Sequence, residues 1–147
     1  MRGRLKKLVK RPEKLAFGSI VNQGLPFYGG CVEYCTEVET KAGTVEIEIP
    51  EYYAALLHVE LDEKQADVFA EPYTARFEKV AAGVHSLRLT AYGTRINTFG
   101  QLHNCNRKEE YYGPKSYRTS GKNWSYVYQL HQTGVTVAPI VRVLEEK

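Results

Sequence analysis

Residues suited to binding a ligand are concentrated between Tyr92 and Tyr128, where aromatic rings stand among polar side chains. Sugars stack their flat C–H faces on aromatic rings, and their hydroxyls exchange hydrogen bonds with Arg, Asn and His side chains. This stretch therefore contains the residue types that a sugar site would use. The expected contacts of such a site are Arg95, Asn97, His103 and Trp124 from this stretch, with Tyr52 and Tyr53 as two further rings.

The aromatic residues Trp124, Tyr126 and Tyr128 allow a second interpretation, because they occupy alternate positions of an expected strand. Alternate residues of a strand share one face, and an aromatic face of this kind is more often part of a core than a ligand platform. We therefore expect Tyr126 and Tyr128 to belong to the core. Trp124, at the mouth of the strand beside the long polar stretch, suits either role.

A carboxylate pair for glycoside hydrolysis is not evident. That reaction needs two carboxylates about 5 to 9.5 Å apart on either side of the scissile bond. Glu46 and Glu48 would stand about 7 Å apart on one strand face, but this face alternates with apolar residues and is expected to be solvated. Glu109 and Glu110 point apart in an extended loop. The sequence therefore predicts no catalytic residue, and it contains no nucleophile motif or phosphate-binding glycine loop.

Cysteine and histidine spacing predicts neither a disulfide framework nor a metal site. The cysteines, Cys31, Cys35 and Cys105, are odd in number. On an extended strand the first two would lie about 13 Å apart, beyond the reach of a disulfide or a shared metal ion. The four histidines share no metal-ligand spacing. We expect reduced thiols, no metal and no cofactor.

Positive charge is concentrated at the N-terminus. Residues 1–14 carry seven Lys or Arg and one Glu, whereas residues 15–147 have a net charge of −3. A nucleic-acid-binding domain is expected to carry a basic stripe across its folded surface, so no nucleic-acid partner is predicted. The apolar run at residues 15–17 is too short for a signal peptide, and no segment reaches the ~20 apolar residues that span a membrane. The sequence thus predicts a cytoplasmic chain without a membrane partner.

Alternation of apolar and polar residues predicts a series of short strands. The absence of helical crossovers between them is typical of an antiparallel β-sandwich or jelly roll. The chain then divides into a basic arm over residues 1–24, helical or irregular, and one all-β sandwich domain over residues 25–147. The expected strands cover residues 31–38, 44–50, 56–61, 65–70, 83–92, 124–134 and 135–144, and the first two are expected to form a hairpin through a turn at residues 41–43.

Several short motifs stand in a characteristic order along the chain: Gly30 with Tyr34, Val59 to Lys64, Pro72 with Tyr73, and Gly83 with His85. In this order and spacing, residues 29–38, 44–77 and 82–103 resemble the sugar-binding, galactose-binding-like jelly-roll domains of family 2 and related bacterial glycoside hydrolases. One departure is that Asp62-Glu63 stands where the family often has Asn-Gly. Asn-Gly adopts positive φ easily and Asp-Glu does not, which argues against a tight two-residue turn there.

This resemblance implies an accessory module of a longer carbohydrate-active enzyme, with catalysis on a separate barrel domain. Two roles then remain open. In the first, the module binds a glycan or glycoside substrate. In the second, it is a structural domain that packs against the catalytic domain of the parent enzyme without sugar affinity of its own. Exposed rings around a groove at Trp124, Tyr52 and Tyr53 would favour binding, and buried rings would favour packing.

Overall fold

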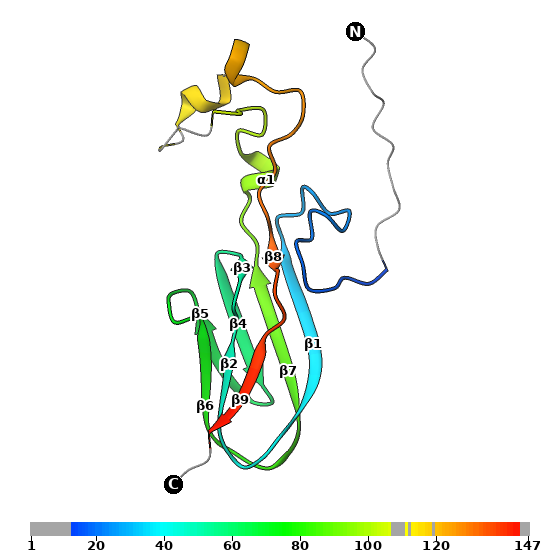
Figure 1. Ribbon diagram of the computed structural model, residues 1–147, viewed down its shortest axis with the longest axis vertical. Helices are drawn as coiled ribbons and strands as arrows, with labels where there is room; N and C mark the ends of the chain where they lie inside the picture. Colours follow the sequence, from blue (N-terminus) through cyan, green and yellow to red (C-terminus); the bar gives the residue numbers. More distant parts are fainter. Residues whose placement is uncertain (1–12, 107–110, 112, 119, 145–147) are drawn as a thin grey trace.

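The computed structural model describes residues 13–106, 111, 113–118 and 120–144, which form antiparallel β-structure with little helix (Figure 1). The all-β prediction is therefore confirmed. The helical elements of this described part are α1 (Ile96–Phe99) and the 3-10 helices η1 (Pro114–Arg118) and η2 (Gly121–Asn123). The strands are β1 (Cys31–Thr40), β2 (Gly43–Glu48), β3 (Tyr52–Tyr53), β4 (Leu56–Leu61), β5 (Lys64–Val68), β6 (Thr74–Val80), β7 (Gly83–Tyr92), β8 (Gly134–Val135) and β9 (Ile140–Leu144).

Two sheets share one apolar core. A four-stranded sheet has the order β1-β7-β4-β5 and a three-stranded sheet has the order β6-β2-β9, while β3 and β8 form a short separate pair. Each of these pairings is antiparallel. Both sheets contribute buried side chains to the core, among them Val45, Ile47, Phe77, Leu57, Val59, Leu87 and Leu89.

Period-two alternation places these core side chains. On β7, Leu87 and Leu89 are 2% and 1% exposed. Arg88 between them points to the outer face, where its guanidinium lies 3.5 Å from the Glu60 carboxylate on β4. Burying one leucine side chain stabilises a fold by about 1.5 to 3 kcal/mol, so repeated alternation is what holds the sheets together. The strand predicted over residues 83–92 is therefore confirmed as β7.

The predicted hairpin between the first two strands is wrong. β1 pairs with β7 over its whole length, and β2 pairs with β6 and β9 in the other sheet. The turn at residues 41–43 therefore carries the chain from one sheet to the other. Gly43 has a φ of 149°, and a Cβ there would lie 2.5 Å from the carbonyl oxygen of Leu144 on β9. This position needs glycine because the β9 backbone passes so close.

The tight turn between β4 and β5 forms despite the Asp-Glu sequence, so the argument against it was wrong. Leu61 pairs with Lys64, and Asp62 takes a φ of 51°. The Asp62 carboxylate explains how the turn is stabilised. Its Oδ1 accepts a hydrogen bond from the Ser86 backbone N–H at 2.8 Å, and its Oδ2 lies 2.6 Å from His85 Nδ1. Contacts from β7 thus stabilise a conformation that the local sequence disfavours.

Two further strand predictions need correction. β6 was not predicted, although it alternates buried Ala75 and Phe77 with exposed Arg76. The strand expected over residues 124–134 is absent: this segment is irregular apart from an isolated bridge between Trp124 and Asn104, with β8 beginning only at its last residue. The expected final strand is divided between β8 and β9. Aromatic residues fit a strand and an extended loop equally well, so alternation over residues 124–128 was misleading.

The described part of the N-terminal arm is irregular and contacts the β-structure. The backbone N–H groups of Gly18 and Ile20 donate to the carbonyls of Val135 and Thr133, each at 3.0 Å. The Ile20 side chain is fully buried. Residues 1–12, which carry most of the basic charge, lie outside the described residues, and the domain boundary at residue 24 stays a prediction.

Candidate functional site

The six residues expected to bind sugar lie in two separate parts of the structure. Tyr52 and Tyr53 form β3, which pairs with β8. The other four belong to the long connection between β7 and β8, which Figure 1 shows extending beyond the ends of the sheets. Tyr52 and Tyr53 line the smaller of the two hollows described below. None of the six residues lines the larger one.

A hollow of about 330 Å³ lies beside β3. Its aromatic lining consists of Tyr52, Tyr53, Phe69 and Tyr73. Phe69 is 70% exposed and Tyr53 is 40% exposed, so large parts of both rings are accessible to a ligand. Small-molecule sites start at about 300 Å³ and are lined largely by aromatic and apolar groups with a few polar ones. This hollow has about the volume of the smallest such sites, and its lining combines aromatic rings with one carboxylate.

Glu51 supplies the carboxylate of the hollow, and two hydroxyls hold it in place. Tyr53 donates its hydroxyl hydrogen to Glu51 Oε1 at 3.1 Å, and Thr136 Oγ1 donates to Glu51 Oε2 at 2.6 Å. The Thr136 backbone N–H also donates to the Glu51 carbonyl at 3.1 Å. The hydrogen bond to this carboxylate, together with its negative charge, raises the pKa of Tyr53. Two hydroxyl donors thus orient the carboxylate of a residue that lines the hollow.

Tyr52 forms a supporting wall of the hollow. Its ring packs edge-on against Tyr73, with centroids 5.2 Å apart and an interplanar angle of 82°. Its hydroxyl donates to the carbonyl of Val68 at 3.4 Å. Burial, followed by the charge of Tyr73, raises the pKa of Tyr52. Of the two predicted tyrosines, Tyr53 is therefore the more accessible and Tyr52 the more structural.

His103 and Trp124 stack on each other within the long connection. Their ring centroids are 4.2 Å apart and the rings are 18° from parallel. His103 Nδ1 lies 2.8 Å from the carbonyl oxygen of Ser125, and the Ser125 N–H donates to the His103 carbonyl at 2.9 Å. One face of the Trp124 ring is therefore covered by imidazole, and the indole is half-buried. The structure brings these two predicted residues together.

Tyr126 is an accessible ring that the sequence assigned to the core, and that assignment was wrong. It is 80% exposed and meets Trp124 edge-on, with centroids 6.3 Å apart. Tyr128 is partly buried and packs against His103 and Phe27 instead. Tyr126 lies outside the core because residues 124–128 leave the sheets and form part of the projecting connection.

Asn97 is engaged inside the protein. It is 2% exposed. Its Nδ2 donates to the His131 carbonyl at 2.7 Å, and its Oδ1 accepts from the His131 backbone N–H at 2.9 Å. Nδ2 also lies 3.4 Å from Thr133 Oγ1. The amide thus joins the two ends of the long connection, which assigns it a structural role.

Arg95 stands just before α1, and its backbone carbonyl accepts hydrogen bonds from the N–H groups of Thr98 and Phe99. Its side chain is exposed. Within the described residues, no hydrogen bond or ion pair engages the guanidinium. It remains accessible to a ligand, but it lines neither described hollow.

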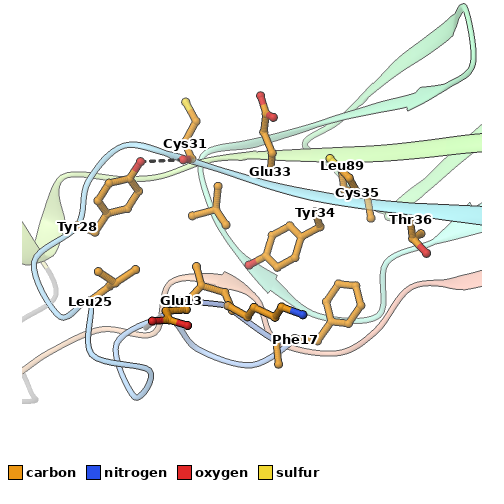
Figure 2. A pocket seen from close by; sticks show the side chains of 14 residues that line it. Glu13, Phe17, Leu25, Tyr28, Cys31, Glu33, Tyr34, Cys35, Thr36 and Leu89 are labelled. Atoms are coloured by element: carbon orange, nitrogen blue, oxygen red, sulfur yellow. Dashed lines mark hydrogen bonds between the residues drawn. The ribbon is translucent and has the colours of Figure 1, made fainter. Parts of the chain in front are cut away.

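A larger groove, of about 1240 Å³, lies between residues 13–17 and β1 (Figure 2). Phe17 stacks on Tyr34, with centroids 5.2 Å apart and the rings 11° from parallel. Figure 2 shows Tyr34 and Leu25 directed into the space between β1 and the arm, and Glu33 directed away from it. The lining mixes apolar side chains with charged ones such as Glu13 and Lys14, and none of the six predicted residues belongs to it.

Glu46 and Glu48 are confirmed as residues of an outward strand face. Glu46 Oε1 lies 3.3 Å from Arg76 Nη1, and Glu48 pairs with Arg142. Each carboxylate is thus used in a cross-strand ion pair, and neither lines a described hollow. Glu109 and Glu110 lie outside the described residues.

Metal-ligating and thiol groups are dispersed. Among the described residues, no group of three or more His, Cys, Asp and Glu side chains is arranged to hold a metal ion. The three cysteines are free thiols; Cys31 and Cys35 are exposed on β1, and Cys105 is partly exposed.

Sequence reasoning missed Glu51, Phe69 and Tyr73 as neighbours of the two predicted tyrosines. Glu51 directly precedes Tyr52, but Phe69 and Tyr73 follow it by about twenty residues and reach the hollow only through the β4–β5 hairpin. The run Glu51-Tyr52-Tyr53 at the end of an alternating strand was the available local signal.

Comparison with known proteins identifies no family: no family model, curated protein or solved structure matches this chain. In the described residues there is also no helix whose length and apolar character would let it cross a membrane.

Proposed function

We propose that this chain is a non-catalytic carbohydrate-binding accessory domain of a larger glycoside hydrolase, folded as a galactose-binding-like jelly-roll sandwich. The observation that carries the binding role is the hollow beside β3, whose lining combines the accessible residues Tyr53 and Phe69 with Glu51, and the Glu51 carboxylate accepts a hydrogen bond from the Tyr53 hydroxyl. Two antiparallel sheets around one core are compatible with a jelly roll. The order of the sequence motifs supports the parent enzyme class.

A glycan array followed by calorimetric titration of the 147-residue chain tests this function. If a sugar ring stacks on Phe69, the Phe69→Ala variant loses that contact and binds about five- to fiftyfold more weakly, because ring stacking contributes about 1 to 2 kcal/mol. Phe99→Ala is the matched control: its ring is 67% exposed, close to the 70% of Phe69, but it does not line the hollow.

The Trp124→Ala variant tests whether the projecting connection between β7 and β8 takes part in sugar binding. A loss of affinity with an unchanged melting temperature would extend the sugar site to Trp124 and its neighbour Tyr126. Unfolding would instead make the His103–Trp124 stack a structural element. Absence of binding to every oligosaccharide at about 10 mM would overturn the carbohydrate-binding role.

The alternative function is a structural domain that docks on the catalytic barrel without sugar affinity. Its support is a concentration of exposed large apolar side chains in the connection between β7 and β8: Phe99, Tyr111, Tyr117, Tyr126 and Val127 are 67%, 85%, 55%, 80% and 71% exposed. Apolar surface of this kind marks interaction sites. If a partner normally covers it, the isolated chain should self-associate and bind a hydrophobic dye, and the double substitution Tyr126→Ser with Val127→Ser should reduce both.

A further inference from the structure

The hollow beside β3 has a negative electrostatic character. Among the described residues that line it, Glu51 carries a formal negative charge, and no Lys or Arg is present. The remaining lining consists of four aromatic residues, two alanines and Pro50. The faces of aromatic rings carry partial negative charge and attract cations. A ligand with a cationic group is therefore favoured over one with a carboxylate or sulfate.

Glu51 has the geometry to receive such a group. The donors Tyr53 and Thr136 each engage a different carboxylate oxygen. An ionised carboxylate has about four acceptor positions, so two positions remain for a ligand while the side chain is already oriented. A fixed carboxylate loses less side-chain entropy on binding than a free one.

The charge distribution along the chain points in the same direction. Residues 13–93, which include the whole lining of the hollow, contain six Lys or Arg and thirteen Asp or Glu, a net charge of −7. Residues 94–133, which form the connection, contain six Lys or Arg and two Glu, a net charge of +4. The hollow therefore lies in the acidic part of the chain, whose field attracts cations at low ionic strength.

Resting on the proposed carbohydrate-binding function, we propose that the hollow beside β3 selects an amino sugar, whose free ammonium group binds the Glu51 carboxylate while the sugar ring packs against Phe69 and Tyr53. The ammonium also faces the negative ring faces, as cations do in aromatic cages. An N-acetylated sugar keeps the ring shape but loses the charge. The selectivity thus resides in one carboxylate and the rings beside it.

The test compares oligosaccharides of equal length by calorimetric titration of the whole chain: the glucosamine trimer, the N-acetylglucosamine trimer, the glucose trimer and the galacturonate trimer. We expect the glucosamine trimer to bind about three- to thirtyfold more tightly than the N-acetylglucosamine trimer at low salt. This preference should shrink in 0.5 M NaCl, because exposed charge pairs are screened.

Glu51→Gln should abolish the preference, because glutamine keeps the shape of the side chain but not its charge. Glu63→Gln is the matched control, since it removes one negative charge in the β4–β5 turn, outside the hollow, and it should retain the preference. Tyr53→Phe, which removes one hydroxyl that holds Glu51, should weaken the preference in part and provides a second variant if Glu51→Gln does not fold.

Each result that contradicts the amino-sugar inference leads to a different conclusion. Equal affinity for the charged and neutral trimers, or a preference that survives in Glu51→Gln, overturns the amino-sugar inference and leaves the carbohydrate-binding function standing. Tighter binding of a trilysine peptide than of the glucosamine trimer overturns it in favour of a basic peptide ligand. Absence of binding to all four trimers at about 10 mM overturns the amino-sugar inference, whereas only absence of binding to every oligosaccharide of the glycan array overturns the proposed function.

Discussion

His85 illustrates how one side chain can carry a pH-dependent contact. Its Nδ1 lies 2.6 Å from Asp62 Oδ2 and its Nε2 lies 2.9 Å from the Ala81 carbonyl oxygen. Both partners are hydrogen-bond acceptors, so the ring satisfies them fully only as the doubly protonated imidazolium. The hydrogen bonds to Asp62 and Ala81 raise the pKa of His85, and the hydrogen bond from His85 lowers the pKa of Asp62. The positive charge of Lys64 lowers the pKa of His85, but by less than these hydrogen bonds raise it.

These directions predict a pH window for the contact. A raised histidine pKa contributes stability below the ordinary value of about 6.5, which is lost as pH rises through the folded-state pKa. A lowered aspartate pKa contributes stability above the ordinary value of about 3.8, which is lost as pH falls through the folded-state pKa. The stability advantage of the wild type over His85→Gln should therefore be largest between about pH 4 and pH 6.5. Urea unfolding at several pH values measures it.

His58 provides the control for this pH experiment. Its Nδ1 lies 2.6 Å from Asp67 Oδ1, as close as in the His85 contact, but the side chains are 25% and 54% exposed. Solvent weakens such a pair, so His58→Gln should change the free energy of unfolding by less than about 1 kcal/mol across the pH range. An advantage of the wild type over His85→Gln that grows above pH 8 would contradict the imidazolium assignment.

Asn97→Ala should destabilise the fold by about 1 to 3 kcal/mol, because it removes both hydrogen bonds to His131 and leaves the backbone N–H and carbonyl of that residue without their partner. Chemical unfolding measures this change. Asn22→Ala is the control, since Asn22 is exposed and should change stability by less than about 0.5 kcal/mol. A variant of Asn97 with native stability and reduced glycan binding would instead return this residue to the ligand site.

At the level of elements, the passage from β1 to β2 depends on close backbone contact. Gly43 and Gly83 both adopt positive φ, 149° and 150°. A Cβ on Gly43 would lie 2.5 Å from the Leu144 carbonyl oxygen, whereas a Cβ on Gly83 would have no neighbour within 4 Å. Alanine variants of the two glycines therefore distinguish the cost of backbone strain, at Gly83, from the added cost of a steric clash, at Gly43.

Gly83→Ala should cost about 1 to 3 kcal/mol of unfolding free energy from backbone strain alone. Gly43→Ala should cost about 1 to 3 kcal/mol more, because it also pushes β9 away from β2. Hydrogen exchange should show faster exchange of the β9 amides in Gly43→Ala only. Equal destabilisation of the two variants would mean that β9 moves to make room for the added Cβ without further loss of stability.

At the level of the whole molecule, the described part of the arm contacts the β-structure through Phe17 and Ile20, which both follow residue 14. Phe17 stacks on Tyr34, and Ile20 is buried. Glu13 and Lys14 are exposed. Deleting residues 1–14 should therefore shift the melting temperature by no more than about 3 °C. Differential scanning calorimetry provides the measurement, and a larger loss would show that the deleted residues also stabilise the sheets.

Ile20→Ala is the contrasting variant for the arm. It should destabilise the protein by about 2 to 5 kcal/mol, because it leaves a cavity at a fully buried position. If this variant unfolds at the wild-type temperature, the arm does not belong to the cooperative unit of the domain.

The sequence by itself determined which faces of β2 and β7 are buried. Val45 and Ile47 on β2, and Leu87 and Leu89 on β7, could be assigned to the core because the two-residue period of a strand is a local property. The absence of helical crossovers was equally local, and it was sufficient for the all-β class. The tyrosines of β3 could be proposed for a site because ring chemistry depends on residue type alone.

Only the tertiary structure decided which strands pair and what surrounds each candidate residue. β1 pairs with β7 rather than with β2, the turn at Asp62 is held by His85 from β7, and Asn97 is buried against His131. These partners are 23 or more residues apart in sequence. The hollow beside β3 likewise needs Phe69 to return through the β4–β5 hairpin. Long-range contacts of this kind arise from the packing of the whole chain, so a local pattern does not specify them.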